Sequence, residues 1–208
     1  MPAETHFYEP SAGHRLPHDP FKAIVAPRPI GWIGTVAADG TRNLAPYSYF
    51  NAVCDAPPML MFSSNGRKDT LRNAEATGCF TWNLATRPLA DRMNRTSAPV
   101  ASDVDEFELA GLTATPGTMI PAPRVAESPA ALECRVVQVV ALHDLAGAPA
   151  DHFMVVGQVV GVHIDPAFLK DGLFDTAATR PILRAGYRAD YAELGPDAMF
   201  QMTRPTSG

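Results

Sequence analysis

The sequence has little cysteine and no long hydrophobic run. Its three cysteines are Cys54, Cys79 and Cys134, and none belongs to a CxxC pair. An odd number with this spacing makes a poor disulfide framework and a poor zinc site, so reduced thiols in a cytoplasmic protein are the simplest interpretation. The most apolar stretches, residues 135–142 and 153–164, are far shorter than the about 20 residues of a membrane-spanning helix. The N-terminus shows no basic segment before an apolar core, so we expect neither a secretory signal nor membrane association.

Positive charge is also scarce. The 208 residues include 17 Lys and Arg against 22 Asp and Glu, which gives a net charge of −5. Proteins that bind nucleic acid non-specifically depend on a basic surface, so we expect no nucleic-acid partner. Hydrophobic residues make up 46% of the chain, enough for a folded core. The 20 prolines favour strands, turns and loops over a helical bundle.

Proline and polar residues divide the chain. We predict an N-terminal arm over residues 1–20, one domain over residues 21–195 and a C-terminal tail over residues 196–208. Within the domain, residues 111–131 form a long proline-rich loop. His14 and His18 lie four residues apart in the arm, but prolines disrupt a helix there and a metal site needs three or four convergent ligands. We therefore predict no metal site.

Short strands joined by tight turns dominate the pattern of residues 22–84, and two long strands follow later in the chain. The apolar run 22–26 opens this strand-and-turn region. Further strands are expected at residues 31–37, 42–53, 59–63, 79–84, 131–143 and 152–164. The 42–53 strand contains Pro46, which cannot donate to a ladder, so it lies at a sheet edge or is bulged. In the 79–84 strand, alternation places Phe80 and Trp82 on one face.

Helices are few and short in this pattern. They are expected at residues 70–76, 86–94 and 103–109, the first with Asp69 as N-cap and Gly78 as its stop. The last segment, residues 166–195, is expected to be helical or irregular. Strands with few helices predict a mainly β fold, a closed or nearly closed β-barrel with flanking helices.

Several common catalytic motifs are missing. The sequence contains no GxxxxGK[ST], no GxGxxG after a strand, no GxSxG and no HExxH. These absences argue against a P-loop NTPase, a standard dinucleotide-binding Rossmann unit, a serine hydrolase of the α/β type and a zinc peptidase.

Residues 43–51 (NLAPYSYFN) form the first candidate site. A proline bulge lies among small residues, hydroxyls and aromatics, and a bulged edge strand leaves backbone N–H groups free to face a ligand. The alternative is a core strand with ordinary aromatic packing, and composition alone favours neither.

Residues 63–70 (SSNGRKDT) form the second candidate site, between a buried strand and a helix N-terminus. Free amides, the positive end of the helix dipole and the pair Arg67–Lys68 converge there, which suits a phosphate. The alternative is a solvated basic loop.

At these two segments the sequence resembles the flavin reductase-like family of FMN-binding split barrels. The variant with Arg-Pro, Trp, Thr and Lys-Asp-Thr is similar to the flavoredoxin-like branch. The resemblance rests on several segments that occur in the order expected for the family, and no single segment is specific by itself. These segments are residues 28–35 (RPIGWIGT), 43–51, 56–63 (APPMLMFS), 68–70 (KDT), 80–84 (FTWNL), 152–159 (HFMVVGQV), 184–191 (RAGYRADY) and 204–205 (RP).

The resemblance implies a homodimer of six-stranded Greek-key split barrels that binds FMN near the subunit interface. FAD is the alternative flavin. The positions that would line the flavin ring and ribityl chain are Trp32, Thr35, Ala45, Pro46, Tyr47, Ser48, Phe50, Asn51, Ser63 and Ser64. Arg67, Lys68 and Thr70 would hold the phosphate, and His152 would face the nicotinamide.

The implied activity is that of an FMN-dependent NAD(P)H:flavin oxidoreductase, a flavin reductase able to serve a partner monooxygenase. Flavin performs the redox chemistry itself, so such an enzyme needs no nucleophile or acid–base pair, and none is found. An FMN-binding electron carrier without nicotinamide oxidation is the alternative, and a barrel with an empty pocket is a third. Gln158 stands where the family often has glutamate, so no carboxylate role is assigned there.

Overall fold

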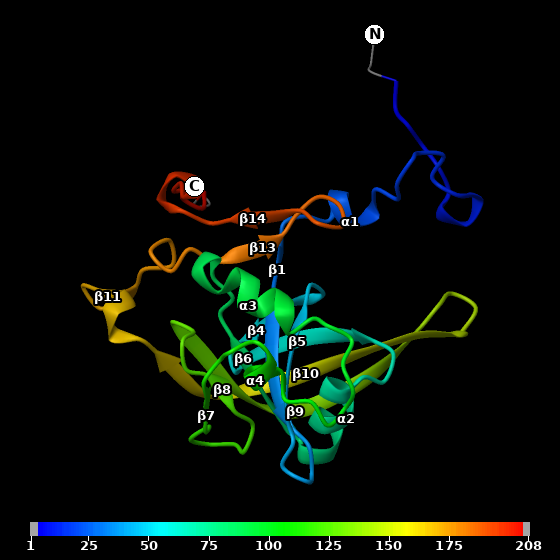
Figure 1. Ribbon diagram of the computed structural model, residues 1–208. Helices are drawn as coiled ribbons and strands as arrows, with labels where there is room; N and C mark the ends of the chain where they lie inside the picture. Colours follow the sequence, from blue (N-terminus) through cyan, green and yellow to red (C-terminus); the bar gives the residue numbers. More distant parts are fainter. Residues whose placement is uncertain (1–3, 206–208) are drawn as a thin grey trace.

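The fold is built on one seven-stranded antiparallel sheet, seen in a computed structural model that describes residues 4–205 (Figure 1). The strand order is β3-β2-β6-β9-β10-β5-β4. In chain order the strands are β2 (Gly31–Val36), β3 (Arg42–Tyr47), β4 (Phe50–Asp55), β5 (Pro58–Asn65), β6 (Cys79–Asn83), β9 (Ala130–His143) and β10 (Pro149–Ile164).

The two edge strands of this sheet are neighbours in sequence. β3 ends at Tyr47 and β4 begins at Phe50, so only Ser48 and Tyr49 join opposite edges of the sheet. The sheet must therefore curl until its edges meet, which confirms the predicted mainly β barrel with flanking helices. Two predictions are corrected: the sheet has seven strands rather than six, and residues 42–53 form two strands because the chain turns after Pro46.

The barrel interior and its outer face each carry a hydrophobic core. Successive residues of a strand point to opposite faces, and β2 shows this directly. Ile33 packs inside the barrel with Phe62 and Phe80, whereas Trp32 packs outside with Met93. The interior is closely filled, since a Cβ added at Gly157 would lie 2.4 Å from the Phe80 ring.

Short helices cover the barrel. They are α2 (Asp69–Thr77), η2 (Arg87–Leu89), α3 (Ala90–Arg95) and α4 (Glu106–Leu109). Leu71 and Ala74 of α2 pack into the barrel interior, and Gly78 ends α2 in the left-handed conformation, as predicted. The predicted N-cap is wrong by one residue: Lys68 occupies that position, and Asp69 is already helical and pairs with Arg72.

A small second sheet lies across the barrel, in the order β1-β13-β14 (Figure 1). Its strands are β1 (Arg28–Pro29), β13 (Ile182–Arg184) and β14 (Tyr191–Glu193). The expectation of a helical or irregular 166–195 segment is therefore wrong, because β13 and β14 pair with each other and with β1. Most of the apolar run 22–26 lies in the short helix α1 (Phe21–Ile24).

The remaining elements are short and peripheral. They are η1 (Pro10–Ala12), β7 (Ala114–Thr115), β8 (Arg124–Val125), η3 (Pro166–Phe168), β11 (Leu169–Lys170), β12 (Leu173–Phe174) and η4 (Pro196–Ala198). The described part of the arm extends away from the barrel, and residues 1–3 and 206–208 lie outside the described residues (Figure 1). No helix within residues 4–205 is long and apolar enough to cross a membrane.

One buried carboxylate orders the proline-rich 111–131 loop. Glu133, on β9, is fully buried and accepts hydrogen bonds from the amides of Thr118, Met119 and Ile120. It also lies 2.5 Å from Nε2 of His163 on β10. The predicted loop is thus a fixed structure with its own β7–β8 hairpin.

Candidate functional site

A cavity of about 480 Å³ opens where three segments meet: the β3–β4 connection, the start of α2 and residues 96–100. Its volume is within the usual range for small-molecule sites. Its lining is Asn43, Ala45, Pro46, Tyr47, Ser48, Tyr49, Ser63, Asn65, Lys68, Asp69, Thr70, Thr96, Ser97, Ala98, Pro99, Val100 and Glu106.

The edge strand β3 supplies one wall. Ala45 and Pro46 are half-buried, and β3 pairs only with β2 in the large sheet. Pro46 fits there because an edge position needs no further N–H donor. The Tyr49 carbonyl accepts a hydrogen bond from the Ser63 amide at 2.8 Å, which ties the β3–β4 turn to β5. The turn therefore holds its backbone and the Ser48 hydroxyl at the cavity.

The N-terminus of α2 supplies a second wall. Lys68 precedes the helix in an extended conformation, and the helix N-terminus has no side-chain capping hydrogen bond. The first helical bond runs from the Arg72 amide to the Lys68 carbonyl at 3.0 Å. The earlier amides of a helix have no intrahelical acceptor and carry the positive end of the dipole, so they suit an anion. Lys68 adds a mobile cation, and Thr70 adds a hydroxyl.

A buried amide joins these two walls. Asn43 Nδ2 on β3 donates to Thr70 Oγ1 at 2.9 Å and to Thr35 Oγ1 at 3.1 Å. Asn73 of α2 donates to the same Thr35 hydroxyl at 3.2 Å. Thr35 therefore contributes from behind the cavity, by fixing the side chain that orients Thr70.

The cavity carries both signs of charge. Asp69 is paired with Arg72, which offsets its charge near Lys68. Glu106 of α4 also lines the cavity and accepts a hydrogen bond from the Leu44 amide at 3.0 Å. Burial raises the pKa of the Glu106 carboxyl, and this hydrogen bond only partly opposes the shift.

Tyr47 is held as a neutral hydroxyl. Its ring is buried and packs 5.0 Å from the Phe62 ring, measured between centroids. Burial raises the pKa of the Tyr47 phenol, while the hydroxyls of Thr70 and Ser64 act in the opposite direction. The group can therefore donate a hydrogen bond at neutral pH and is a poor proton acceptor.

The predicted positions fall into three groups. The structure brings together Ala45, Pro46, Tyr47, Ser48, Ser63, Lys68 and Thr70, which all line the cavity.

Four other predicted positions lie inside the protein. Trp32 is fully buried and donates through Nε1 to Thr96 Oγ1 at 3.0 Å, so it supports the wall from behind. Ser64 points into the interior because side chains alternate along β5, and its hydroxyl donates to the Gly66 carbonyl. Thr35 does not line the cavity, and its hydroxyl oxygen accepts a hydrogen bond from Asn43, which does. The last of the four is Phe50, which stacks on the Trp82 ring at 5.7 Å.

Three further predicted positions lie at the surface outside the cavity lining. Asn51 is exposed on edge strand β4. Arg67 forms an ion pair with Glu75 and lies over the Phe153 ring, 5.1 Å from its centroid.

His152 is the third of these surface positions. Its Nδ1 lies 2.9 Å from the Ala150 carbonyl oxygen. Its ring meets the Tyr49 ring edge-on at 6.5 Å, so it is one ring removed from the cavity.

Sequence reasoning missed the segment 96–100 and two buried polar groups. Thr96 and Ser97 follow α3 and line the cavity, while their hydroxyls donate to the Met93 and Asn94 carbonyls. Their contribution depends on α3 folding back over β2, which no local pattern reports. Asn43 stood inside a candidate segment but was not singled out. Glu106 gave no distinguishing signal, because it is one of several carboxylates in the acidic segment 103–109.

The cavity continues toward the second sheet. An adjoining space of about 330 Å³ shares Pro46, Tyr47, Ser48 and Ser97 with it. This space reaches Arg184, Arg188 and Tyr191 of the β13–β14 region. Within residues 4–205, no three His, Cys, Asp or Glu side chains gather as metal ligands.

The flavin reductase like domain matches residues 25–181. The chain belongs to this family. The match covers the barrel, the cavity and the start of the second sheet, and it confirms the resemblance identified from the sequence. Membership supports flavin binding and an oxidoreductase function of the flavin reductase type.

Individual relatives agree with this assignment. An uncharacterized protein of Halalkalibacterium halodurans is 33% identical over 187 residues, 88% of each chain. The structure of nitrilotriacetate monooxygenase component B from Bacillus cereus matches with a TM-score of 0.86 and 29% identity, over 96% of this chain and 100% of that one. A Shewanella frigidimarina protein described as a flavin reductase with a split barrel domain matches with a TM-score of 0.74, 23% identity and 90% of each chain. This last similarity concerns the fold, and it confirms the split barrel.

Proposed function

We propose that this protein is an FMN-dependent NAD(P)H:flavin oxidoreductase whose flavin occupies the 480 Å³ cavity. The observation that carries the proposal is the juxtaposition of an uncapped helix N-terminus with a polar edge-strand wall in one cavity of a flavin reductase-like barrel. The first element suits a phosphate and the second suits a polar chain and ring edge.

The FMN phosphate would lie at the start of α2. The free amides there, the Lys68 ammonium and the Thr70 hydroxyl provide donors and positive potential. Asn43 fixes Thr70 by donating to its hydroxyl oxygen, so the Thr70 hydroxyl would be held in position to donate to the phosphate. This arrangement favours FMN over riboflavin, which lacks the phosphate.

The polar ring edge and ribityl chain would lie along the β3–β4 turn. Ser48 and Ser63 offer hydroxyls, and the backbone of Ala45–Tyr49 offers amides and carbonyls at a sheet edge. Flavin supplies the hydride and electron chemistry when bound. The protein's part is to bind, orient and tune the ring, and the neutral Tyr47 hydroxyl is a donor suited to that task.

His152 fits a place at the rim rather than contact with the flavin. Its ring lies against Tyr49, which lines the cavity, so it would contact a nicotinamide only if that ring reached across Tyr49. We therefore propose that His152 positions Tyr49 at the entrance. Its substitution is expected to raise the KM for NADH or NADPH more than it lowers kcat.

Anaerobic reduction of bound FMN tests this proposal. The protein is mixed with FMN and desalted, its absorbance spectrum is recorded, and NADH or NADPH is then added without oxygen. Retained flavin peaks that bleach rapidly are the expected result. Retained peaks that stay oxidised would contradict the reductase and favour an electron carrier. If no flavin is retained, turnover with free FMN supports a reductase that uses flavin as a substrate, and its absence contradicts both.

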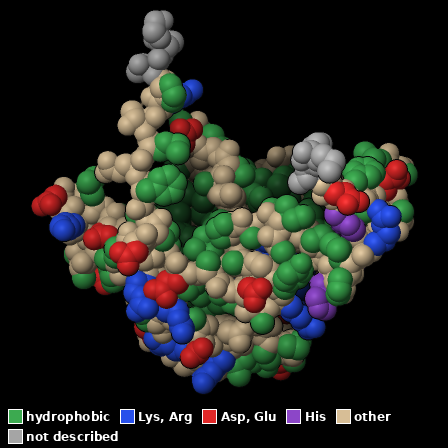
Figure 2. Space-filling view, turned by 90° about the horizontal axis from the view of Figure 1, so that it is seen from above, with side chains coloured by type: hydrophobic (Ala, Val, Ile, Leu, Met, Phe, Trp, Pro, Cys, Tyr) green, Lys and Arg blue, Asp and Glu red, His purple; other side chains and the backbone are tan. Residues whose placement is uncertain are grey.

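A homodimer and a monooxygenase partner belong to the same proposal. Phe21, Ile24 and Val25 of the α1 region are 53%, 72% and 48% exposed, and apolar surface of this kind often marks an interface. The face that carries the arm and the tail is hollowed and lined with hydrophobic side chains (Figure 2). The Bacillus cereus protein is named as a monooxygenase component, which suggests that reduced flavin passes to a separate oxygenase. Sedimentation equilibrium of the purified protein tests the dimer.

A further inference from the structure

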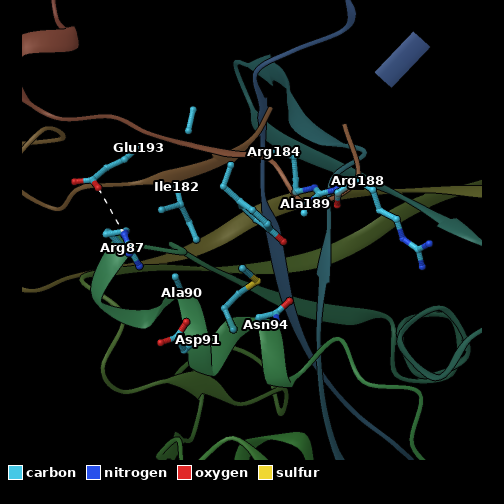
Figure 3. Close-up of a pocket in the computed structure, with 12 residues that line it drawn as sticks. Arg87, Ala90, Asp91, Asn94, Ile182, Arg184, Arg188, Ala189 and Glu193 are labelled. Atoms are coloured by element: carbon cyan, nitrogen blue, oxygen red, sulfur yellow. Dashed lines mark hydrogen bonds and ion pairs between the residues drawn. The ribbon is translucent and has the colours of Figure 1, made fainter. Parts of the chain in front are cut away.

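A second, larger cavity of about 790 Å³ lies between α3 and the β13–β14 pair (Figure 3). The 330 Å³ space joins it to the proposed flavin cavity, because this space shares residues with both. Arg184, Arg188 and Tyr191 are among those shared with the larger cavity. A molecule in the larger cavity would therefore lie next to the flavin.

The two ends of this cavity differ in charge. Arg87 and Glu193 lie at one end, where their side chains are 3.9 Å apart, and Asp91 is on the same side (Figure 3). Glu193 also pairs with Arg180 at 2.5 Å. The charges at this end are therefore balanced, and a further anion gains little there.

The other end has positive charge without a carboxylate partner. Within residues 4–205, neither Arg184 nor Arg188 forms an ion pair. Arg184 donates to the Arg188 carbonyl at 2.7 Å, and its guanidinium lies 4.6 Å from the centroid of the Tyr191 ring. These contacts hold the guanidinium in place and leave other N–H donors free.

The wall between the two ends is apolar. Ile182 and Met93 are buried at its base, and Ala90, Ala189 and Ala192 complete it. Such a wall suits a hydrocarbon or aromatic body. A ligand with several charges along its length would meet either this wall or the carboxylates of Asp91 and Glu193.

We propose that this cavity binds an organic anion with an apolar body and a single carboxylate, held by Arg184 and Arg188 beside the flavin. The inference deepens the proposed function by naming a substrate class for the site, and it rests on that function for the flavin's presence. The carboxylate would take charge-assisted hydrogen bonds from the two guanidinium groups. The apolar body would lie over Ile182 and Met93.

Calorimetric titration of the full-length protein with 2-naphthoate tests the inference, with the neutral 2-naphthamide as matched ligand. Naphthoate is expected to bind at least about tenfold more tightly, because only the charged ligand gains from the arginines. Arg188→Gln and Arg184→Gln should each remove most of that preference. Arg184→Lys keeps the charge but loses the planar contact with Tyr191, so it should give an intermediate loss. Arg95→Gln, on an exposed position of α3 outside the cavity, is the control.

Equal binding of the two ligands, or a naphthoate preference that both arginine variants retain, would overturn the proposal. A separate competition experiment uses inorganic pyrophosphate. If pyrophosphate competes with naphthoate at equal concentration, the site binds phosphates, and the assignment to a carboxylate is wrong. Each titration is repeated on FMN-loaded protein. Naphthoate binding with neither FMN retention nor turnover of free FMN would contradict the proposed function alone, and FMN retention with no naphthoate preference would contradict this inference alone.

Discussion

The side-chain amide of Asn43 donates a hydrogen bond to the hydroxyl of Thr70 at 2.9 Å, and this contact joins the edge of the barrel to the first turn of α2. Both side chains are buried, 5% and 1% exposed, although they lie 27 residues apart. The contact holds together the two walls that would bind the polar chain and the phosphate of FMN. Its loss should therefore weaken cofactor binding as well as stability.

Asn43→Ala removes this link. We expect the free energy of unfolding to fall by about 1–3 kcal/mol, because the buried hydroxyls of Thr70 and Thr35 lose a donor. FMN affinity should fall by about tenfold, since Thr70 is no longer oriented. Urea denaturation and fluorescence titration with FMN measure the two effects.

Asn73→Ala is the matched control for this variant. Asn73 also donates to Thr35 but does not line the cavity. It should cost some stability while leaving FMN affinity within about twofold. Equal losses of FMN affinity in the two variants would show that the Asn43–Thr70 contact has no special place in the site.

Glu106→Gln is expected to strengthen FMN binding. The carboxylate lines the cavity and repels a phosphate when ionised, whereas glutamine keeps an oxygen for the Leu44 amide. We expect about a fivefold gain for FMN at pH 8 and little change for riboflavin. Glu108→Gln, on the exposed side of α4, should leave both affinities unchanged. A Glu106→Gln gain shared equally by the two ligands would count against a phosphate near this group.

The same variant has a pH signature in stability. Burial raises the pKa of Glu106 in the folded protein above its unfolded value of about 4.3. The unfolded carboxyl then loses its proton first, so stability falls as pH rises from about 4.3 through the folded-state pKa. Glu106→Gln should lack this fall, which urea midpoints between pH 4 and pH 8 would reveal.

Glu133 shows the opposite pH dependence. Desolvation raises the pKa of its carboxyl, but the bonds from His163 and three loop amides together outweigh it, so the pKa is lowered. Its stabilising effect is present above the unfolded pKa of about 4.3 and is lost as pH falls through the folded value. Glu133→Gln should cost about 2 kcal/mol at pH 7 and lose less stability than wild type on acidification. Glu9→Gln in the exposed arm is the control, and identical acid profiles for all three proteins would refute this role.

Gly157→Ala tests the packing of the barrel interior. The new methyl group would lie 2.4 Å from the Phe80 ring and 3.1 Å from Cβ of Cys134, inside a filled core. We expect a loss of about 1–3 kcal/mol, because overpacking forces side chains to move. Gly195→Ala adds the same group where nothing lies within 4 Å, so it should be neutral within about 0.5 kcal/mol. Thermal unfolding compares the pair.

Much of the fold could be predicted from the sequence because its signals are local. The alternation in 79–84, the Asp-Gly turn near residue 40 and Gly78 each report one element, and the structure contains all three. The 166–195 segment shows the limit. β13 is three residues long and depends on pairing with β1, more than 150 residues away in the chain. A strand this short has no periodicity of its own to detect.

The candidate site divides in the same way. The start of α2 and the β3–β4 turn could be located because helix starts and edge prolines leave local marks. Which side chains face the cavity depends on strand phase, and this separates Ser63 from Ser64. Arg67 and Lys68 are adjacent in the sequence, but only Lys68 lines the cavity. Arg67 instead forms an ion pair with Glu75. The segment 96–100 and Glu106 reach the site only through packing between distant elements.

The central claim is that the FMN phosphate lies at the start of α2, and Lys68→Gln tests it most directly. Calorimetric titration with FMN and riboflavin is carried out on wild type, Lys68→Gln and the neighbouring Arg67→Gln. Lys68→Gln should weaken FMN by about tenfold or more and riboflavin by less than about twofold, because only FMN has the charged group. Arg67→Gln should have little effect on either ligand. Equal losses for both ligands in Lys68→Gln, or a larger FMN loss in Arg67→Gln, would contradict the account.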